Sequence, residues 1–220
     1  MRHHTHYLRH ITDWFEWLKN PKFGDIAGGN YAEFETDGTL RFHGDACVYD
    51  DLKVPALSAF GRGSPTQTDY KGGKVLTLAS NIDQGIYFNV QVPHKYKLGG
   101  EMEIHAHIVV PTAGAGAGAE NVKLDFTYSW AGIGDTFPTA SILTATRDVQ
   151  NDAADTHIYM DIGELVDPGI EQTLGVSSMI ICSLTRDVSV ANDYSSSVYL
   201  LEADFHFEID TLGSREEYVK

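Results

Sequence analysis

The sequence predicts an all-β protein: an antiparallel β-sandwich or jelly roll of about eight or nine strands, with a short amphipathic helix at the N-terminus. Three observations predict this class. Apolar and polar residues alternate with a period of two almost everywhere after residue 74. The chain contains 21 glycines among its 220 residues, which indicates many turns. No helical pattern of useful length interrupts the strands, which argues against a parallel α/β scaffold.

Residues 1–22 are predicted to form the amphipathic helix. Apolar side chains recur there at steps of three and four residues, and the pattern stops before Asn20-Pro21. One helix cannot bury such a stripe alone, so we expect it to dock on its own domain, on a sister subunit or on another protein. The residues expected to bind that partner are Leu8, Ile11, Trp14, Phe15, Trp17 and Leu18.

Residues 23–47 are expected to form a linker followed by a β-hairpin. The segment "FGDIAGGN" has the composition of a linker. Asp37-Gly38 stands between two β-prone runs, which predicts a hairpin over residues 31–43. The sandwich body is expected over residues 48–220, with a strand in "ACVYDDLKVP" and then a long surface loop in "SAFGRGSPTQTDYKGG".

Four segments of the body alternate so regularly that they predict which side chains face the core. The segment "SSMIICSLTRD" differs, because it is an almost continuous apolar run, and we expect it to be buried on both faces. The side chains predicted to face inward are Ile86, Phe88, Val90 and Val92; Met102, Ile104, Ala106 and Ile108; Val122, Leu124, Phe126, Tyr128 and Trp130; and Tyr199, Leu201, Ala203, Phe205, Phe207 and Ile209.

The charge balance limits the possible partners. Lys and Arg total 16 against 31 Asp and Glu, and this net charge of −15 argues against nucleic acid. Charging the 10 histidines near pH 5 would remove most of the self-repulsion, so mild acid is expected to favour self-association. No apolar stretch approaches a membrane span, and no signal peptide is recognisable. Cys47 and Cys182 form no metal-binding spacing and are expected to lie buried in strands of a protein folded in a reducing cytoplasm.

His105-x-His107 is the one segment that suggests chemistry. Two imidazoles at this spacing lie on one face of a strand and can converge on one metal. Gly99, five residues and the His-x-His pair resemble the opening half of the cupin motif. That motif next requires a glutamate, where this chain has Pro111 and Thr112, and its second half is not found. The sequence therefore favours histidines that share a solvent- or subunit-facing surface with neighbouring acids.

A further ligand would have to come from the last strand. His206 and its neighbours Glu202, Asp204 and Glu208 could supply one if that strand pairs beside the His-x-His strand. The sequence thus predicts no catalytic residue, no cofactor and no metal, with His105, His107 and His206 as the metal candidates. The "AGAGAGA" run lacks the residues of a phosphate-binding loop and is expected to be a flexible tip.

The order of several short segments resembles a family of uncharacterised virion structural proteins of tailed bacteriophages. These segments are "YDDLKVP", "GIYFNVQVPHKYKLGGEMEIHAHIVV", "FTYSWAGIGDTFP" and "LLEADFHFEIDTLGSREEYVK", and the resemblance covers residues 48–220. It implies a non-enzymatic component of the virion head, neck or tail that is folded in the host cytoplasm. Its implied partners are other phage structural proteins and further copies of itself, with a trimer favoured. Residues 1–47 have no counterpart in the resemblance.

Two other functions remain open from the sequence. A receptor- or glycan-binding module of a tail or fibre would use the loops at residues 61–73, 111–121 and 132–138 as its contact surface. A cupin-like metal-binding enzyme would use His105, His107 and His206.

Overall fold

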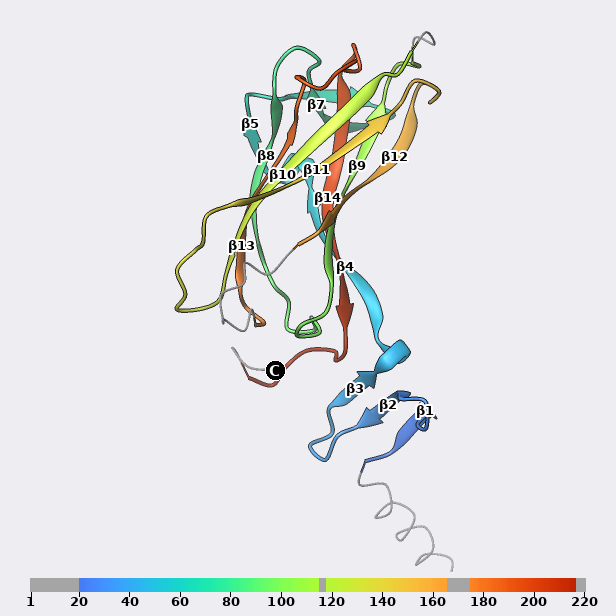
Figure 1. Cartoon of the computed structure of the whole chain (residues 1–220), viewed down its shortest axis with the longest axis vertical. Helices are drawn as coiled ribbons and strands as arrows, with labels where there is room; N and C mark the ends of the chain where they lie inside the picture. The colour runs from blue at the N-terminus through green and yellow to red at the C-terminus, as the bar shows by residue number, and fades with distance from the viewer. Residues whose placement is uncertain (1–19, 115–117, 166–174, 217–220) are drawn as a thin grey trace, which may run out of the picture.

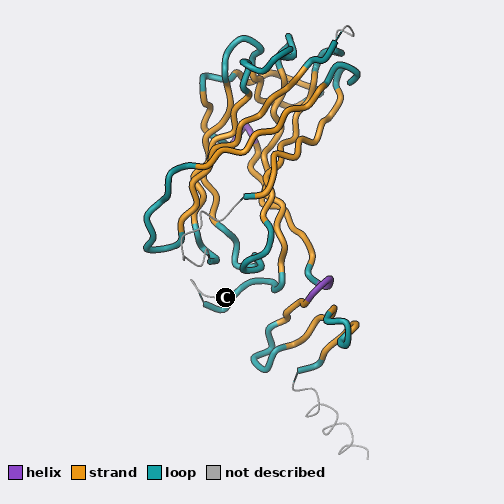
Figure 2. Tube along the Cα trace, viewed as in Figure 1, coloured by secondary structure: helices purple, strands orange, loops and turns teal. Residues whose placement is uncertain are grey.

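The computed structural model describes residues 20–114, 118–165 and 175–216, and it shows two large antiparallel sheets packed face to face. A small third sheet lies at one end of this sandwich (Figures 1 and 2). Within the described ranges, the helical elements are two short 3₁₀ turns, Gly44–Ala46 and Ala56–Ser58. The prediction of an all-β antiparallel sandwich is confirmed. The predicted N-terminal helix lies outside the described residues.

The small sheet contains the predicted hairpin. Its strands are β1 (Lys22–Asp25), β2 (Asn30–Phe34) and β3 (Leu40–His43). At the turn, Asp37 Oδ1 accepts a hydrogen bond from the Thr39 N–H at 2.9 Å, and Gly38 adopts a left-handed φ of 89°. The predicted linker is wrong at its start, because those residues form β1. This strand pairs with β2, and Phe23 packs edge-on against Phe34 with ring centroids 6.5 Å apart.

Polar contacts join the small sheet to the sandwich. The Arg41 guanidinium contacts Glu35 at 2.7 Å and Asp210 at 3.3 Å. The Phe42 N–H also donates to the Asp210 carbonyl at 2.7 Å. Asp210 follows directly after the last strand of the sandwich, so these contacts tie the hairpin to the end of that strand.

The six-stranded sheet has the C-terminal strand at its centre. Its order is β12-β9-β14-β7-β6, and β4 also pairs with β14. The strands are β4 (Val48–Pro55), β6 (Thr66–Tyr70), β7 (Gly73–Leu78), β9 (Met102–Val110), β12 (Thr156–Glu164) and β14 (Val198–Ile209). Two of these strands differ from the sequence prediction, which contains no strand at β12 and has a loop at β6.

The five-stranded sheet has the order β11-β10-β13-β8-β5. Its strands are β5 (Phe60–Arg62), β8 (Gln84–Gln91), β10 (Asn121–Ala131), β11 (Ser141–Asp148) and β13 (Met179–Arg186). β5 also falls in the predicted loop, and β11 was not predicted. The described residues therefore form 14 strands, more than the eight or nine that the alternation indicates. The additional strands are mostly short or exposed, so their apolar pattern is weak.

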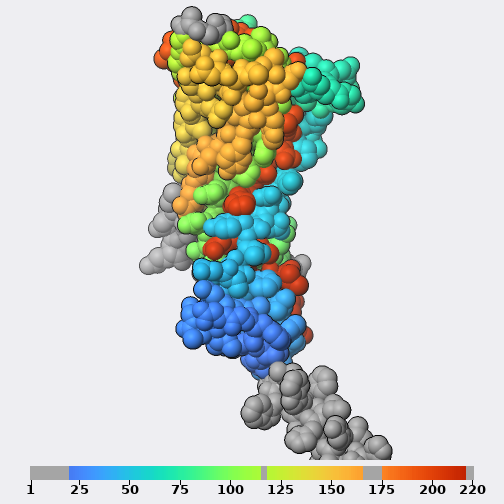
Figure 3. Space-filling model, turned by 90° about the vertical axis from the view of Figure 1, so that its right-hand side faces the viewer, coloured from blue at the N-terminus to red at the C-terminus, as the bar shows by residue number. Residues whose placement is uncertain are grey.

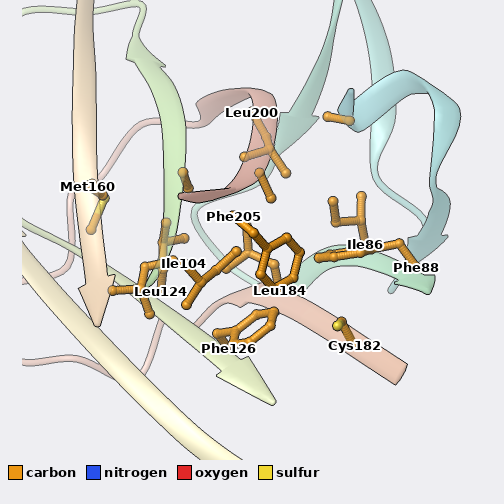
Figure 4. Close-up of a cluster of buried hydrophobic side chains, with 14 of the residues drawn as sticks. Ile86, Phe88, Ile104, Leu124, Phe126, Met160, Cys182, Leu184, Leu200 and Phe205 are labelled. Atoms are coloured by element: carbon orange, nitrogen blue, oxygen red, sulfur yellow. The ribbon is translucent and has the colours of Figure 1, made fainter. Parts of the chain in front are cut away.

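The core lies between the two large sheets (Figure 4). The rings of Phe88, Phe126 and Phe205 meet there with centroids 5.9 to 6.3 Å apart, and they join β8 and β10 of one sheet to β14 of the other. Every inward side chain predicted for β8, β9 and β10 belongs to this core. The alternation of these strands is therefore a reliable guide to the covered side.

For β14, the prediction of which side chains face the core is wrong at the start of the strand. Val198 and Leu200 are fully buried there, whereas Tyr199 and Leu201 are only partly buried. The register against β9 shifts between Leu200 and Glu202, which is a β-bulge. An extra residue in one strand exchanges the two faces, so the uninterrupted alternation in the sequence predicts the wrong phase before the bulge.

Candidate functional site

The outer face of the five-stranded sheet has a large area that contains no charged residue. The Arg62 guanidinium borders it, 5.8 Å from the centroid of the Tyr87 ring. Residues paired across neighbouring strands form rows on this face. One row crosses all five strands, through Phe60, Tyr87, Ser183, Thr127 and Ile142. We call this area the uncharged face; its residues are Phe60, Tyr87, Asn89, Gln91, Thr127, Ser129, Ile142, Met179, Ile181 and Ser183. Phe60 is 77% exposed and Ile142 is 65% exposed. Large apolar side chains thus lie among hydroxyls and amides on this surface.

The expectation that the β13 segment is buried on both faces is wrong. Ile180, Cys182 and Leu184 face the core, whereas Ile181 is 47% exposed on the opposite side. Within the described ranges, only the inner side of this strand is covered by the other sheet. The apolar residues on its outer side therefore form part of the uncharged face instead of a second core.

The charged end of the same outer face lies beside the uncharged face. Lys123 Nζ contacts Asp187 Oδ2 at 2.5 Å and Asp125 Oδ1 at 3.4 Å. The Lys123 contact, together with the Ser189 hydroxyl and N–H, lowers the pKa of Asp187 to about 2. The Asp187 hydrogen bond in turn raises the pKa of Lys123. Charge is thus concentrated at one end of this sheet.

The outer face of the six-stranded sheet has the opposite chemistry. We call it the His–acid face; its residues are Tyr49, Asp51, Lys53, Glu103, His105, His107, His157, Tyr159, Asp161, Glu202, Asp204 and His206. Figure 3 shows β12 and β4 on this side of the molecule, with β9 and β14 visible between them. In the register of the sheet, β9 lies between β12 and β14, and β14 lies between β9 and β4.

His105, His107 and Asp204 converge at the centre of this face. His105 Nε2 contacts Asp204 Oδ1, and His107 Nε2 lies 3.7 Å from Asp204 Oδ2. One ligand atom from each residue lies within 4.8 Å of the other two. Among the described residues, this is the one group of at least three His, Cys, Asp or Glu side chains that meets this spacing. The register explains it, because Asp204 pairs directly with His105 and diagonally with His107.

Two members of this cluster are buried, although they lie on the outer face. His105 is 5% exposed and Asp204 is 2% exposed. The Tyr159 ring lies against His105 with centroids 4.6 Å apart. The expectation that these histidines face solvent or a neighbouring subunit is therefore wrong for His105. A large aromatic side chain on the adjacent strand covers it, and a single-strand pattern does not show such a neighbour.

Polar partners differ among the cluster residues. His107 Nδ1 shares a hydrogen bond with His157 Nε2 at 2.8 Å. By contrast, His105 Nδ1 and Asp204 Oδ1 are buried and make no hydrogen bond within the described part of the chain, although Asp204 Oδ1 contacts His105 Nε2. Buried polar atoms usually have a partner, so these two atoms mark the centre of the cluster as unusual.

His206 does not join the cluster. Its Nδ1 shares a hydrogen bond with Asp51 Oδ1 at 2.9 Å, and its ring stacks on Tyr49. This hydrogen bond lowers the pKa of Asp51. The conditional prediction that β14 lies beside β9 is confirmed, but Asp204, and not His206, is the residue that it brings to His105 and His107.

Cys182 provides no reactive thiol in this arrangement. Cys182 lies in β13 against the core, where burial raises the pKa of its thiol. Cys47 is only partly buried and precedes β4, so the expectation of a buried strand position is wrong for this residue. Its Sγ lies 3.5 Å from the Phe42 carbonyl. A buried neutral thiol is chemically inert.

The loops expected to form one glycan-binding surface lie at opposite ends of the sandwich. The β6–β7 turn and the end of β9 are close together, because Tyr70 bonds the Asp155 side chain and the Asp155 N–H bonds the Val110 carbonyl. Residues 132–138 instead follow the far end of β10 (Figure 1). The three loops therefore do not form a common contact surface.

The predicted partner-binding residues of the N-terminal helix lie outside the described residues. In the described ranges, no helix has the length and apolar character needed to cross a membrane.

No protein-family model matches this chain, and no curated protein matches it. Among solved structures, it is similar to a chain of infectious bursal disease virus Gx strain, with 15% identity and a TM-score of 0.35 over 74% of this chain and 33% of that chain. It is also similar to the CBM22-1 xylan-binding domain from Paenibacillus barcinonensis Xyn10C, with 14% identity and a TM-score of 0.37 over 74% and 94% of the two chains. It is similar as well to the family 11 carbohydrate-binding module from Clostridium thermocellum, with 12% identity and a TM-score of 0.34 over 76% of this chain and 91% of that chain. This chain thus spans about a third of the viral chain.

Proposed function

We propose that this protein is a non-enzymatic structural component of a tailed-bacteriophage particle and that it acts by binding other protein subunits. In this proposal the uncharged face is the contact surface. The partner is a neighbouring structural protein or a further copy of this chain, in a symmetric assembly such as a trimer. The resemblance of residues 48–220 to phage virion proteins supports the particle, and the uncharged face supports assembly.

One observation supports assembly most directly. A chain with a net charge of −15 has an area that crosses five strands and contains no charged residue, with the Arg62 guanidinium at its border over the Tyr87 ring. Ile142, Ile181 and Tyr87 are each at least 46% exposed there. Contiguous apolar surface on a soluble protein marks an interaction site more often than isolated apolar residues do. The depletion of charge and the presence of aromatic residues also match the centre of protein interfaces.

Ile181→Lys tests this proposal. A lysine at the middle of the uncharged face would place an unpaired charge in the contact, so we expect loss of incorporation into particles and loss of self-association. Incorporation is measured by complementing a phage that lacks this protein, and self-association by sedimentation velocity.

Ile82→Lys is the matched control. Ile82 is 51% exposed, close to the 47% of Ile181, but it lies in the turn before β8 and away from the uncharged face. We expect the Ile82→Lys protein to assemble normally. Normal incorporation of the Ile181→Lys protein, with a circular dichroism spectrum like that of the unmodified chain, would refute the proposed contact surface.

A further inference from the structure

The His105, His107 and Asp204 cluster has the composition and compactness of a metal site. Two imidazole nitrogens and one carboxylate oxygen are ligands that zinc and related divalent transition metals bind in proteins. Ligands bound tetrahedrally at about 2.0–2.1 Å from zinc lie roughly 3.4 Å apart. The 3.7 Å between His107 Nε2 and Asp204 Oδ2 is close to this value and too long for an ordinary hydrogen bond.

The hydrogen bond to His157 prepares His107 for such a role. When His107 Nδ1 donates its proton to His157 Nε2, the lone pair of His107 Nε2 is left free on the side of Asp204. Metal-binding histidines generally use their second nitrogen in this manner, which fixes the tautomer and the ring orientation. His157 is therefore placed as an outer residue that orients a ligand.

Burial provides an independent indication of a bound cation. Asp204 is 2% exposed, and its Oδ1 makes no hydrogen bond within the described residues, although it contacts His105 Nε2. A buried carboxylate is costly unless it is paired with a positive charge, and a metal ion bound between Asp204 and the two imidazoles supplies that charge. Glu103, Glu202 and Asp161 lie on the same face and add negative potential around the cluster, which also favours a cation.

From this geometry we propose that His105, His107 and Asp204 bind one divalent transition-metal ion of the zinc type, with His157 orienting His107. The ion links β9 to β14 at the middle of the six-stranded sheet. This site lies on the opposite sheet from the uncharged face. It is independent of the proposed assembly function.

Zinc binding by the full chain, purified without an affinity tag and stripped with a chelator, tests the proposal. The N-terminal segment contains His3, His4, His6 and His10, which can bind zinc without any folded site. These four are therefore replaced by glutamine in the parent protein. We expect isothermal titration with Zn²⁺ to show one equivalent bound by this parent. No binding by the parent would overturn the proposal.

Single variants of this parent then test each assigned role. We expect Asp204→Asn and His107→Gln each to weaken zinc binding by more than about 100-fold, and His157→Phe to weaken it by about 10- to 100-fold without changing the stoichiometry. His206→Gln is the matched control, because His206 lies on the same strand and face but is bonded to Asp51. It should bind zinc as the parent does.

Two further measurements keep the outcome decisive. Circular dichroism establishes that each variant is folded; if Asp204→Asn does not fold, the partly exposed His107 still tests the site through His107→Gln. Substitution with Co²⁺ should give visible absorption bands that change in His107→Gln. Unchanged zinc affinity in folded His107→Gln, or an equal loss in His206→Gln, would assign the zinc to another place and overturn the proposal.

Discussion

The uncharged face and the His–acid face cover the same core from opposite sides, yet their chemistry differs. On the five-stranded sheet, apolar side chains are exposed among hydroxyls and amides, as Ile181 is beside Ser129 and Asn89. On the six-stranded sheet, imidazoles and carboxylates lie together, and the most central pair, His105 and Asp204, is buried. Apolar groups are thus exposed on one face, while the central ionisable pair is withdrawn from water on the other.

This difference teaches that exposure alone does not separate structural from functional residues in a two-sided sheet. Each strand contributes one side chain in two to the shared core, and the other half is free of core packing. An exposed isoleucine and a buried aspartate on those free faces both need an explanation outside the core. The proposed protein contact would account for the first, and the proposed metal ion for the second.

Phe205→Ala should lower the stability most, because it removes a large ring from the core that both faces share. Phe205 is fully buried and contacts the rings of Phe88 and Phe126. We expect a loss of about 3–5 kcal/mol in the free energy of unfolding, measured by chemical denaturation. Tyr87→Ala, on the uncharged face, is the control and should cost less than about 1 kcal/mol. Similar losses in the two variants would mean that the uncharged face is part of the folding core.

Most of the fold could be predicted from the sequence where one side of a strand is covered. The alternation in β8, β9 and β10 predicted their inward residues because burial on one side imposes a period of two. The same argument failed at β14, where the bulge near Leu201 reverses the phase without any signal in the alternation. It also failed for β13, because an apolar run cannot distinguish a second core from an exposed contact surface.

Only part of the candidate site could be predicted from the sequence. His105 and His107 lie two residues apart, so the strand period places them on one face. Asp204 lies far along the chain, and only the pairing of β14 with β9 brings it to them. Asp204 is one of several ligands that the sequence offers on the last strand, and the register of β14 against β9 selects it over His206. His157 lies on β12, where Ile158, Met160 and Ile162 alternate with outward side chains, so a period of two in this segment was the signal that could have found it.

Asp187→Asn tests how much the charged end of the five-stranded sheet stabilises the fold. The Lys123 contact holds the folded pKa of Asp187 at about 2, below the value of about 3.9 in an unfolded chain. The stabilisation is therefore complete above about pH 4 and is lost as the pH falls toward 2. Because Asp187 is near the surface, we expect a contribution of about 1–2 kcal/mol.

Urea denaturation of the two proteins between pH 7 and pH 2 measures this contribution. The Asp187→Asn protein should be less stable at pH 7, and the difference should shrink below pH 4. An equal difference at every pH would show that the carboxylate charge does not contribute. Ile181→Lys tests the uncharged part of the same sheet, so the two variants separate its stabilising end from its contact surface.

His206→Gln should have the smallest effect and tests whether the His–acid face stabilises the fold through its outer pairs. His206 and Asp51 are both more than a third exposed, and exposed pairs of this kind contribute less than about 1 kcal/mol. Glutamine can still donate a hydrogen bond to Asp51, so we expect chemical denaturation at pH 7 to give nearly the unmodified free energy of unfolding. A loss above about 2 kcal/mol would contradict this, because it exceeds the range of such exposed pairs. The His–acid face would then stabilise the sheet through a connected network, and the two faces would differ in stability as well as in chemistry.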